Sequence, residues 1–126
     1  LGIADRIDML GFLPQEDVLA AMRRARLFVL PSLEEGLGVV LLEALACGTP
    51  IVASAVDGIV DVVTQDVGRL VPPAQPGALA EAIMAILSDD SGWQVMSQAP
   101  RVRAEAEYDW DIIAARLIEV YRSVSD

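Results

Sequence analysis

Short runs of consecutive apolar residues alternate along this chain with longer segments of helical periodicity, and this alternation strongly constrains the fold. Runs that are apolar at every position are typical of strands covered on both faces, as in parallel sheets. Strands that alternate with helices indicate an α/β domain in which helices connect parallel strands. We therefore expect strands at Ile7–Leu10, Leu27–Leu30, Ile51–Ala53 and near Arg69–Val71.

The segments between these strands carry helix signals at their ends. Pro14 suits the first turn of a helix, because its missing N–H would have no partner there. Gly48, followed by Pro50, ends a second helix, and Asp109 is suited to cap the last one. The first expected helix begins at Pro14 and has Val18, Leu19 and Met22 as its buried stripe. Further helices are expected at Gly38–Cys47, Ile59–Val63, Ala78–Leu87 and Trp93–Ala106, the last interrupted by Pro100. The final helix is expected after Asp109, with an apolar face made of Ile113, Leu117, Val120, Tyr121 and Val124.

Length and composition limit the function. A chain of 126 residues is one modest domain. Its net charge is −10, and its basic residues are nine arginines, with no lysine. This negative charge argues against nucleic acid as a partner. Histidine is absent, which excludes an imidazole base or a histidine metal ligand. We expect Cys47 to pack as a small apolar residue, and Trp93 and Trp110 to act as packing anchors.

The most informative segment is the loop Pro31–Gly38, which joins a buried strand to a helix. In parallel α/β sheets, ligands bind at the carboxyl ends of the strands. The first N–H groups of the following helix have no partner and carry a positive partial charge, which suits a phosphate. Gly36 and Gly38 lack side chains that would hold a ligand away from this backbone. The loop therefore predicts a ligand site at the start of the helix.

Two carboxylates flank that helix start, with seven residues between Glu35 and Glu43. Because helical side chains point toward the helix N-terminus, we expect both to reach one pocket, Glu35 at its mouth and Glu43 on its wall. A carboxylate accepts two hydroxyl hydrogen bonds, which suits the vicinal diol of a ribose or hexose. The other interpretation is that Glu34 and Glu35 are solvated acids and that Glu43 is a partly exposed helix residue.

The run Pro31–Ser54 carries a more specific pattern of residues. It resembles the signature of retaining, nucleotide-sugar-dependent glycosyltransferases of the GT-B type, most closely glycosyltransferase family 4, the group 1 glycosyltransferases. That signature has two glutamates separated by seven residues, and its usual Phe is Leu37 in this chain. The matching residues are Pro31, Ser32, Glu35, Gly36, Gly38, Glu43, Ala44, Gly48, Pro50 and the strand Ile51-Val52-Ala53.

The likeness extends over nearly the whole chain. Gly11-Phe12 resembles the family's Phe-Leu-Gly strand end near the nucleotide base, and Asp57–Asp61 stands where Gly-Gly-Ile-Pro-Glu is usual. Gly68–Pro73 resembles the family's late strand, and Tyr108–Trp110 resembles the start of its final helix. The resemblance implies a partial Rossmann-like three-layer sandwich, corresponding to most of a GT-B C-terminal domain, over residues 1–126.

The resemblance also implies roles for individual residues. Glu35 would be the catalytic residue, contacting hydroxyls of the donor sugar, and Glu43 would contact the ribose. The donor would be a nucleotide-diphosphate sugar such as a UDP- or GDP-sugar, its anomeric configuration would be retained, and neither a cofactor nor a metal ion would be needed. The implied donor-binding residues are Gly11, Phe12, Gly36, Leu37, Gly38, Val39, Val40 and Glu43.

Parts of the family's structure have no counterpart in this sequence. The family's C-terminal domain normally opens with two further strands, which bring an Arg and a Lys to the diphosphate. The N-terminal, acceptor-binding domain is a further expected partner, and the first residue, Leu1, leads us to expect a longer parent protein. Catalysis needs groups from both sides of the cleft between the domains, so we expect the isolated chain to be inactive.

Several alternatives follow from the sequence. In one predicted arrangement, Ile7–Leu10 pairs directly with Leu27–Leu30 in a compact, rearranged half-domain. In the other, a second copy of the chain covers the apolar strand edges and the face Ile113–Val124 in an exchanged homodimer. The alternative function is a non-catalytic α/β binding or oligomerisation module on the same scaffold, and a second enzymatic alternative is a GT-B nucleotide-sugar epimerase. We expect a cytoplasmic location, with peripheral attachment of the parent to the inner face of the membrane left open.

Overall fold

The fold is built around a short parallel sheet, seen in a computed structural model that describes residues 2–124. Strands β1 (Phe28–Leu30), β2 (Ile51–Ser54) and β3 (Gly68–Val71) pair in that order, and both pairings are parallel. The middle strand β2 is buried at all four positions, as expected when helices cover both faces of a sheet. The strands predicted at residues 27–30, 51–53 and 69–71 are therefore confirmed to within one residue.

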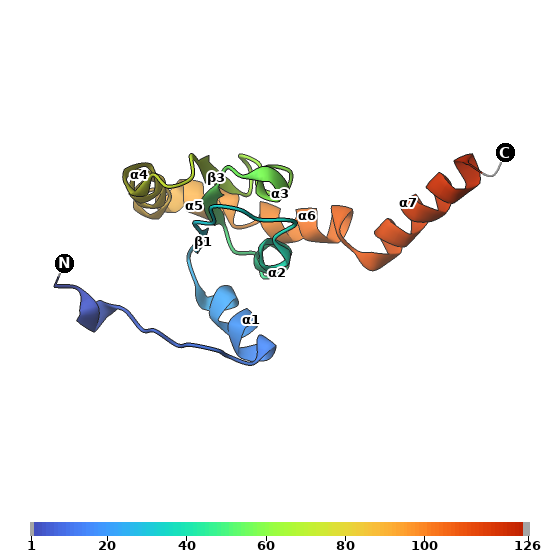
Figure 1. The fold of residues 1–126 in the computed structure, drawn as a ribbon. Helices are drawn as coiled ribbons and strands as arrows, with labels where there is room; N and C mark the ends of the chain where they lie inside the picture. The colour runs from blue at the N-terminus through green and yellow to red at the C-terminus, as the bar shows by residue number, and fades with distance from the viewer. Residues whose placement is uncertain (1, 125–126) are drawn as a thin grey trace.

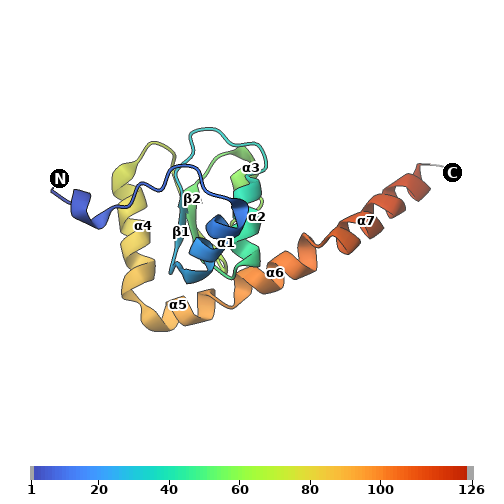
Figure 2. The same cartoon turned by 90° about the horizontal axis from the view of Figure 1, so that it is seen from below.

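Helices cover both faces of this sheet, and alternate residues of β2 point to each side. Ile51 and Ala53 belong to the core that includes residues of α1 and α2, whereas Val52 belongs to the core beneath α4 and α5. Figure 2 shows the sheet between α4 on one side and α2 on the other. The helices are α1 (Gln15–Arg24), α2 (Val39–Ala46), α3 (Asp57–Val60), α4 (Pro76–Ser88), α5 (Asp90–Met96), α6 (Ala99–Glu107) and α7 (Trp110–Ser123).

This arrangement confirms the predicted three-layer α/β fold. Gly48 has a φ of 74°, the left-handed conformation predicted for the end of α2. Pro100 lies in the first turn of α6, so the interrupted helix predicted at Trp93–Ala106 is two helices, α5 and α6. The short helix predicted at Ile59–Val63 begins and ends earlier, at α3.

Helix α1 is fixed to the end of α2 by hydrogen bonds to its backbone. The Thr49 hydroxyl donates to the carbonyl oxygen of Met22 at 2.8 Å, and the Cys47 thiol lies 3.6 Å from the carbonyl oxygen of Leu19. Met22 is buried in the core, and the predicted stripe residues Val18 and Leu19 pack against it. Cys47 also packs against that core, as predicted.

The predicted strand Ile7–Leu10 is wrong. This segment forms no strand, and it continues the exposed arm that runs from residue 2 to α1, which Figure 1 shows beneath the body of the protein. Met9 is 91% exposed. A strand requires a partner for its backbone N–H and C=O groups, and β2 is the strand that pairs with β1 in the described sheet. The predicted direct pairing of Ile7–Leu10 with β1 is therefore wrong, and so is the compact half-domain that depends on this pairing.

The C-terminal helix α7 extends away from the body beyond α6 (Figure 1). Trp110 at its start is 81% exposed, so the prediction that Trp110 is a packing anchor is wrong. Trp93 does pack, against the core beneath α4, and its indole N–H donates to the carbonyl oxygen of Arg26 at 2.6 Å.

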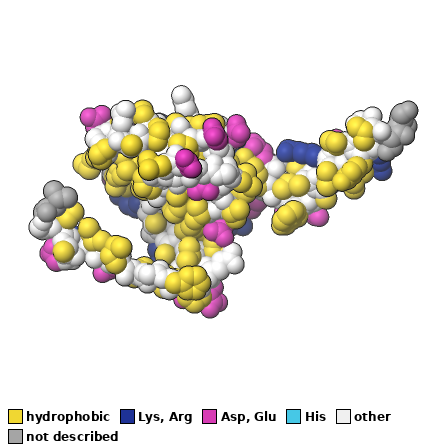
Figure 3. All heavy atoms as spheres, in the orientation of Figure 1, with side chains coloured by type: hydrophobic (Ala, Val, Ile, Leu, Met, Phe, Trp, Pro, Cys, Tyr) yellow, Lys and Arg dark blue, Asp and Glu magenta, His cyan; other side chains and the backbone are white. Residues whose placement is uncertain are grey.

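Figure 3 shows apolar side chains along both the N-terminal arm and α7. A single chain does not test the exchanged homodimer, which stays a prediction.

Each helix described between residues 2 and 124 is too short or too polar to cross a lipid bilayer.

Candidate functional site

The loop Pro31–Gly38 leaves the carboxyl end of β1 and turns into α2, as predicted. Gly38 is the residue before the helix and has a φ of 62°. A Cβ on Gly38 would lie 3.0 Å from the Leu41 side chain and 3.3 Å from the Glu35 side chain. Because the left-handed conformation strongly favours glycine, Gly38 determines the direction in which α2 leaves the loop. A Cβ on Gly36 would meet no heavy atom within 4 Å, so this part of the loop faces open space.

The loop is also held by close backbone contact with the start of α3. A Cβ on Gly58 would lie 1.2 Å from the carbonyl oxygen of Gly36. The Gly58 N–H lies 3.4 Å from the carbonyl oxygen of Glu35. The absence of a side chain at Gly58 therefore lets two segments that follow neighbouring strands lie directly against each other. This contact places the backbone of Glu35 and Gly36 at the carboxyl edge of the sheet.

An open hollow of about 620 Å³ lies at this edge. Glu35, which is half-buried, and Gly36 are among the residues that line it. The Ser32 hydroxyl donates to the Glu35 carboxylate at 3.4 Å. The complete lining is Leu33, Glu34, Glu35, Gly36, Ala55, Val56 and Asp57. Three of these residues are acidic and none is basic, so the hollow favours neutral or cationic groups over anions.

Glu43 lies on a different side of α2. It is half-buried, and its Oε1 accepts a hydrogen bond from Gln15 Nε2 at 2.8 Å. Gln15 is the first residue of α1. The neighbours of Glu43 at Ala44 and Leu45 point into the core. Glu43 therefore lies on the flank of α2 that faces the start of α1.

Glu43 does not share the hollow that Glu35 lines, contrary to the prediction that both reach one pocket. Glu43 is not among the residues that line the hollow at Glu35. Glu43 is the fifth residue of α2, and the rotation of the helix turns its side chain toward Gln15. Glu35 therefore lines the hollow, whereas Glu43 lies against the start of α1, outside that hollow.

The remaining predicted residues lie at the start of α2 or on the arm before α1. Leu37 and Val39 are exposed, Val40 is half-buried, and the first N–H groups of α2 have no partners within the helix. Gly11 has a φ of 64°, and Phe12 is 99% exposed. The candidate site at α2 therefore comprises Glu35 in the preceding loop, the first residues of the helix, and Glu43 beside the start of α1.

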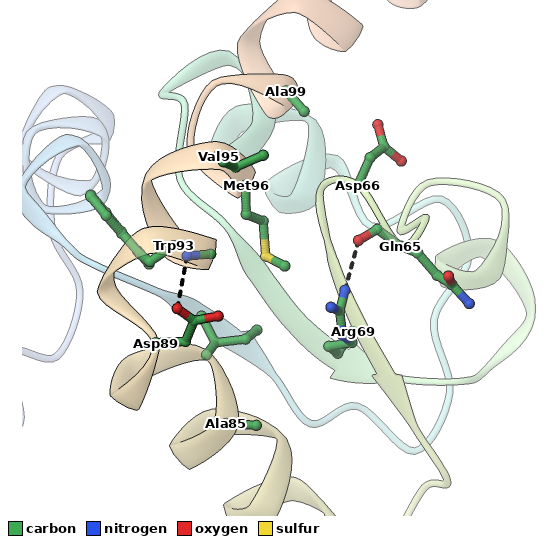
Figure 4. A pocket seen from close by; sticks show the side chains of 11 residues that line it. Gln65, Asp66, Arg69, Ala85, Asp89, Trp93, Val95, Met96 and Ala99 are labelled. Atoms are coloured by element: carbon green, nitrogen blue, oxygen red, sulfur yellow. Dashed lines mark hydrogen bonds between the residues drawn. The ribbon is translucent and has the colours of Figure 1, made fainter.

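A second hollow, of about 430 Å³, lies beside β3 and contains none of the predicted site residues. Figure 4 shows that two of its charged side chains, Arg69 and Asp89, bind nearby backbone. Arg69 donates to the carbonyl oxygen of Gln65 at 2.6 Å, and Asp89 accepts from the Gly92 N–H at 2.9 Å. This bond from the Gly92 backbone is the main reason why the pKa of Asp89 lies below its ordinary value. These groups stabilise local structure, so the site at α2 is the better candidate.

Asp57 and Gln15 are polar residues beside the two carboxylates that the sequence analysis did not predict. Asp57 follows the buried strand β2, and its position at a strand end is a signal that would have placed it in the hollow. Gln15 gives no comparable signal, because its bond to Glu43 joins residues 28 positions apart. Among residues 2–124, no three His, Cys, Asp or Glu side chains are grouped so that they would hold a metal ion.

Comparisons with known sequences identify the family. The family model described as "Glycosyl transferases group 1" matches residues 1–105. The chain is 36% identical to a phosphatidyl-myo-inositol mannosyltransferase of Mycobacterium leprae, over 98% of this chain and 33% of that protein. It is 31% identical to a GDP-mannose-dependent monoacylated alpha-(1-6)-phosphatidylinositol monomannoside mannosyltransferase of Corynebacterium glutamicum, over 96% of this chain and 34% of that protein. The chain thus spans about a third of the length of these relatives.

Solved structures agree with this family. The chain superposes on the Anabaena protein HepE in complex with UDP-glucose with a TM-score of 0.85 and 28% identity, over 98% of this chain and 34% of HepE. It shares the fold of the C-terminal domain of a group 1 glycosyl transferase, LpcC of Francisella tularensis, with a TM-score of 0.72 and 22% identity over 80% of this chain and 53% of that chain. The family match and the fold together show that this chain belongs to the group 1 glycosyl transferases, family 4 of the GT-B type, and has the fold of their C-terminal domain.

Proposed function

We propose that this chain is the donor-binding domain of a longer, retaining hexosyltransferase, called the full-length enzyme below. The enzyme transfers a sugar from a UDP- or GDP-sugar to an acceptor held by an N-terminal domain. The observation that carries this proposal is the position of Glu35. It lies in an open hollow at the carboxyl edge of the sheet, directly before the unpaired N–H groups of α2.

At the sugar end of the site, Glu35 accepts hydrogen bonds from hydroxyls of the donor hexose. Its carboxylate is half-buried and receives one long hydrogen bond, from Ser32 at 3.4 Å, so it has acceptor capacity left for a ligand. The N–H groups of residues 37–40 bind the sugar and the diphosphate, because the start of a helix carries a positive partial charge.

At the nucleoside end, Glu43 accepts hydrogen bonds from the ribose, and Gly11 and Phe12 lie near the base. The exposure of Phe12 supports this assignment, because a ring with no protein neighbour is free to stack on a base. The relative from Corynebacterium glutamicum is GDP-mannose-dependent, and HepE was solved with UDP-glucose, so both nucleotides belong to the proposal. The cytoplasmic location expected from the sequence stays a prediction.

Metal chelation is expected to leave the full-length enzyme active. We assign the diphosphate to backbone N–H groups and not to a metal ion, so excess EDTA should change the rate of sugar transfer by less than about twofold. The measurement is the initial rate with and without EDTA, and with EDTA plus excess Mg²⁺ or Mn²⁺. A strict requirement for an added divalent cation would contradict this assignment.

The isolated chain is expected to bind nucleotide sugars weakly. Glu34, Glu35 and Asp57 line the hollow, and no arginine or lysine joins them to balance two phosphate charges. Calorimetry with UDP-glucose and GDP-mannose should therefore give no saturable binding at micromolar ligand. Circular dichroism on the same sample confirms that the chain is folded. Micromolar affinity would mean that α2 and its neighbours alone hold the diphosphate.

The function itself is tested on the full-length enzyme. We expect it to release UDP or GDP from a nucleotide sugar when a hydroxyl-bearing acceptor is present, and to form a product with the anomeric configuration of the donor. The measurement is nucleotide release across a panel of UDP- and GDP-hexoses, followed by NMR of the product. A protein that binds none of these nucleotides would instead support the non-catalytic module.

A further inference from the structure

We propose that Gln15 is a positioning residue for the ribose site, because it orients the carboxylate of Glu43. This inference rests on the proposed function, in which Glu43 contacts the ribose. It assigns a role to the first residue of α1.

The hydrogen bond has a geometry that leaves Glu43 free to bind a ligand. Gln15 Nε2 donates to Oε1 of Glu43 at 2.8 Å. A carboxylate has two oxygens and about four acceptor positions, so Oε2 and the remaining positions on Oε1 stay available for ribose hydroxyls. Gln15 thus fixes the direction of the carboxylate without occupying it.

The group that donates this hydrogen bond to Glu43 is a neutral amide, and its neutrality leaves the carboxylate able to bind the ribose hydroxyls. Among the described residues, no arginine forms an ion pair with Glu43, and Glu43 accepts a hydrogen bond from the Gln15 amide. An arginine would bind both oxygens of a carboxylate at once and compete with the diol. An amide donor holds one oxygen and preserves the negative charge, which strengthens the bonds from hydroxyl groups.

The helix that carries Gln15 is fixed independently of this bond. Met22 is buried against the core, and the Thr49 hydroxyl donates to its carbonyl oxygen at 2.8 Å. Cys47, which follows α2, contacts the backbone of Leu19. Because α1 is attached to the far end of α2 by these contacts, Gln15 is presented to Glu43 from a rigid support. Such support is what orients a binding side chain before the ligand arrives.

The same placement joins two parts of the candidate site. Gln15 follows Gly11 and Phe12 by a few residues, and these are the residues proposed to lie near the base. The bond from Gln15 to Glu43 therefore connects the segment near the base to the residue that binds the ribose. Replacing Gln15 should change recognition of the ribose hydroxyls and leave the sugar-transfer step unchanged.

The test measures how well the full-length enzyme distinguishes ribonucleotides from their 2′-deoxy counterparts. Calorimetry gives the Kd of UDP, 2′-deoxy-UDP, GDP and 2′-deoxy-GDP for the unsubstituted enzyme and for Gln15→Met, Gln15→Glu, Glu43→Gln and the double variant Gln15→Met with Glu43→Gln. Methionine keeps the length of the side chain and removes the donor. Glutamate also removes the donor, and an acid in the first turn favours the helix, so weaker binding would not come from loss of α1.

We expect Gln15→Met to raise the Kd of the preferred ribonucleotide about three- to tenfold, the range of one hydrogen bond, and to change that of the 2′-deoxynucleotide by less than about twofold. Gln15→Glu should raise the Kd of the preferred ribonucleotide at least as much as Gln15→Met does. In the Glu43→Gln background, Gln15→Met should have no further effect. In transfer assays the KM for the donor should rise while kcat stays within about twofold. The control is Gln94→Met, an exposed glutamine on α5, which should change neither Kd.

The outcomes separate this inference from the proposed function. If the unsubstituted enzyme binds neither UDP nor GDP, the proposed function is wrong and the inference fails with it. If it binds a ribonucleotide, but Gln15→Met leaves both Kd values unchanged or raises them equally, the positioning role of Gln15 is wrong and the proposed function stands.

Discussion

Replacement of Gly58 by alanine is expected to lower the rate of sugar transfer by the full-length enzyme about 100-fold or more, although Gly58 contributes no side chain to the site. The added Cβ would lie 1.2 Å from the carbonyl oxygen of Gly36 and 3.1 Å from the Cα of Leu37. Both neighbours are backbone atoms, so a change of side-chain rotamer does not relieve the overlap. The loop that carries Glu35 must move instead.

Two effects of Gly58→Ala are expected together. Displacement of the loop should lower the rate of transfer by about 100-fold or more, because a misplacement of about 1 Å has an effect of that size. The free energy of unfolding should fall by roughly 2–4 kcal/mol, as for other substitutions that overfill a packed region. The measurements are kcat/KM for the donor and urea unfolding of the same preparation.

Gly77→Ala is the matched control for Gly58→Ala. Gly77 lies in the first turn of α4, and a Cβ there would meet no heavy atom within 4 Å. Alanine is the better helix former by about 1 kcal/mol, so Gly77→Ala should leave the activity unchanged and the stability equal or higher. Full activity of Gly58→Ala would show that the contact with Gly36 does not set the position of Glu35.

Replacement of Glu35 by glutamine is expected to reduce kcat/KM for the donor by about 10- to 150-fold. Glutamine has nearly the same shape, so the loop should keep its conformation. The variant loses the negative charge, and a hydrogen bond to a charged group contributes about 1.5–3 kcal/mol. Since the sugar carries developing positive charge when the bond to the diphosphate breaks, most of the effect should be in kcat.

Glu81→Gln is the control for Glu35→Gln. Glu81 is exposed on α4 and lies outside the hollow at α2, so this variant removes one negative charge without touching the site. We expect its kinetics to match those of the unsubstituted enzyme within about twofold, because isolated surface charges have small effects. If Glu35→Gln behaves like this control, Glu35 does not contact the donor.

The elements that could be predicted from the sequence are those specified by local patterns. Ile51–Ala53 is short, apolar throughout and bounded by Pro50, and the structure has β2 there. Asp109 accepts from the Asp111 N–H at 2.9 Å, as expected of a helix cap. Such signals depend on nearby residues alone, so they remain valid without knowledge of the rest of the fold.

The features that were missed depend on partners distant in the sequence. Ile7–Leu10 has the composition of a strand, but a strand also needs a neighbour, and the segment lies exposed in the arm. Glu43 has the spacing expected of a site residue, and its orientation is set by Gln15, 28 positions away. The close approach at Gly58 likewise comes from the packing of α3 on the loop after β1.

In the proposed site, Glu35 in the loop before α2 and Glu43 beside the start of α1 hold one nucleotide sugar. A crystal structure of the full-length enzyme with a bound UDP- or GDP-hexose tests this arrangement most directly. We expect hexose hydroxyls within hydrogen-bond distance of Glu35, the diphosphate at the N–H groups of residues 37–40, and a ribose hydroxyl on Glu43. A donor bound elsewhere, for example in the hollow beside β3, with neither Glu35 nor Glu43 in contact with it, would contradict the account.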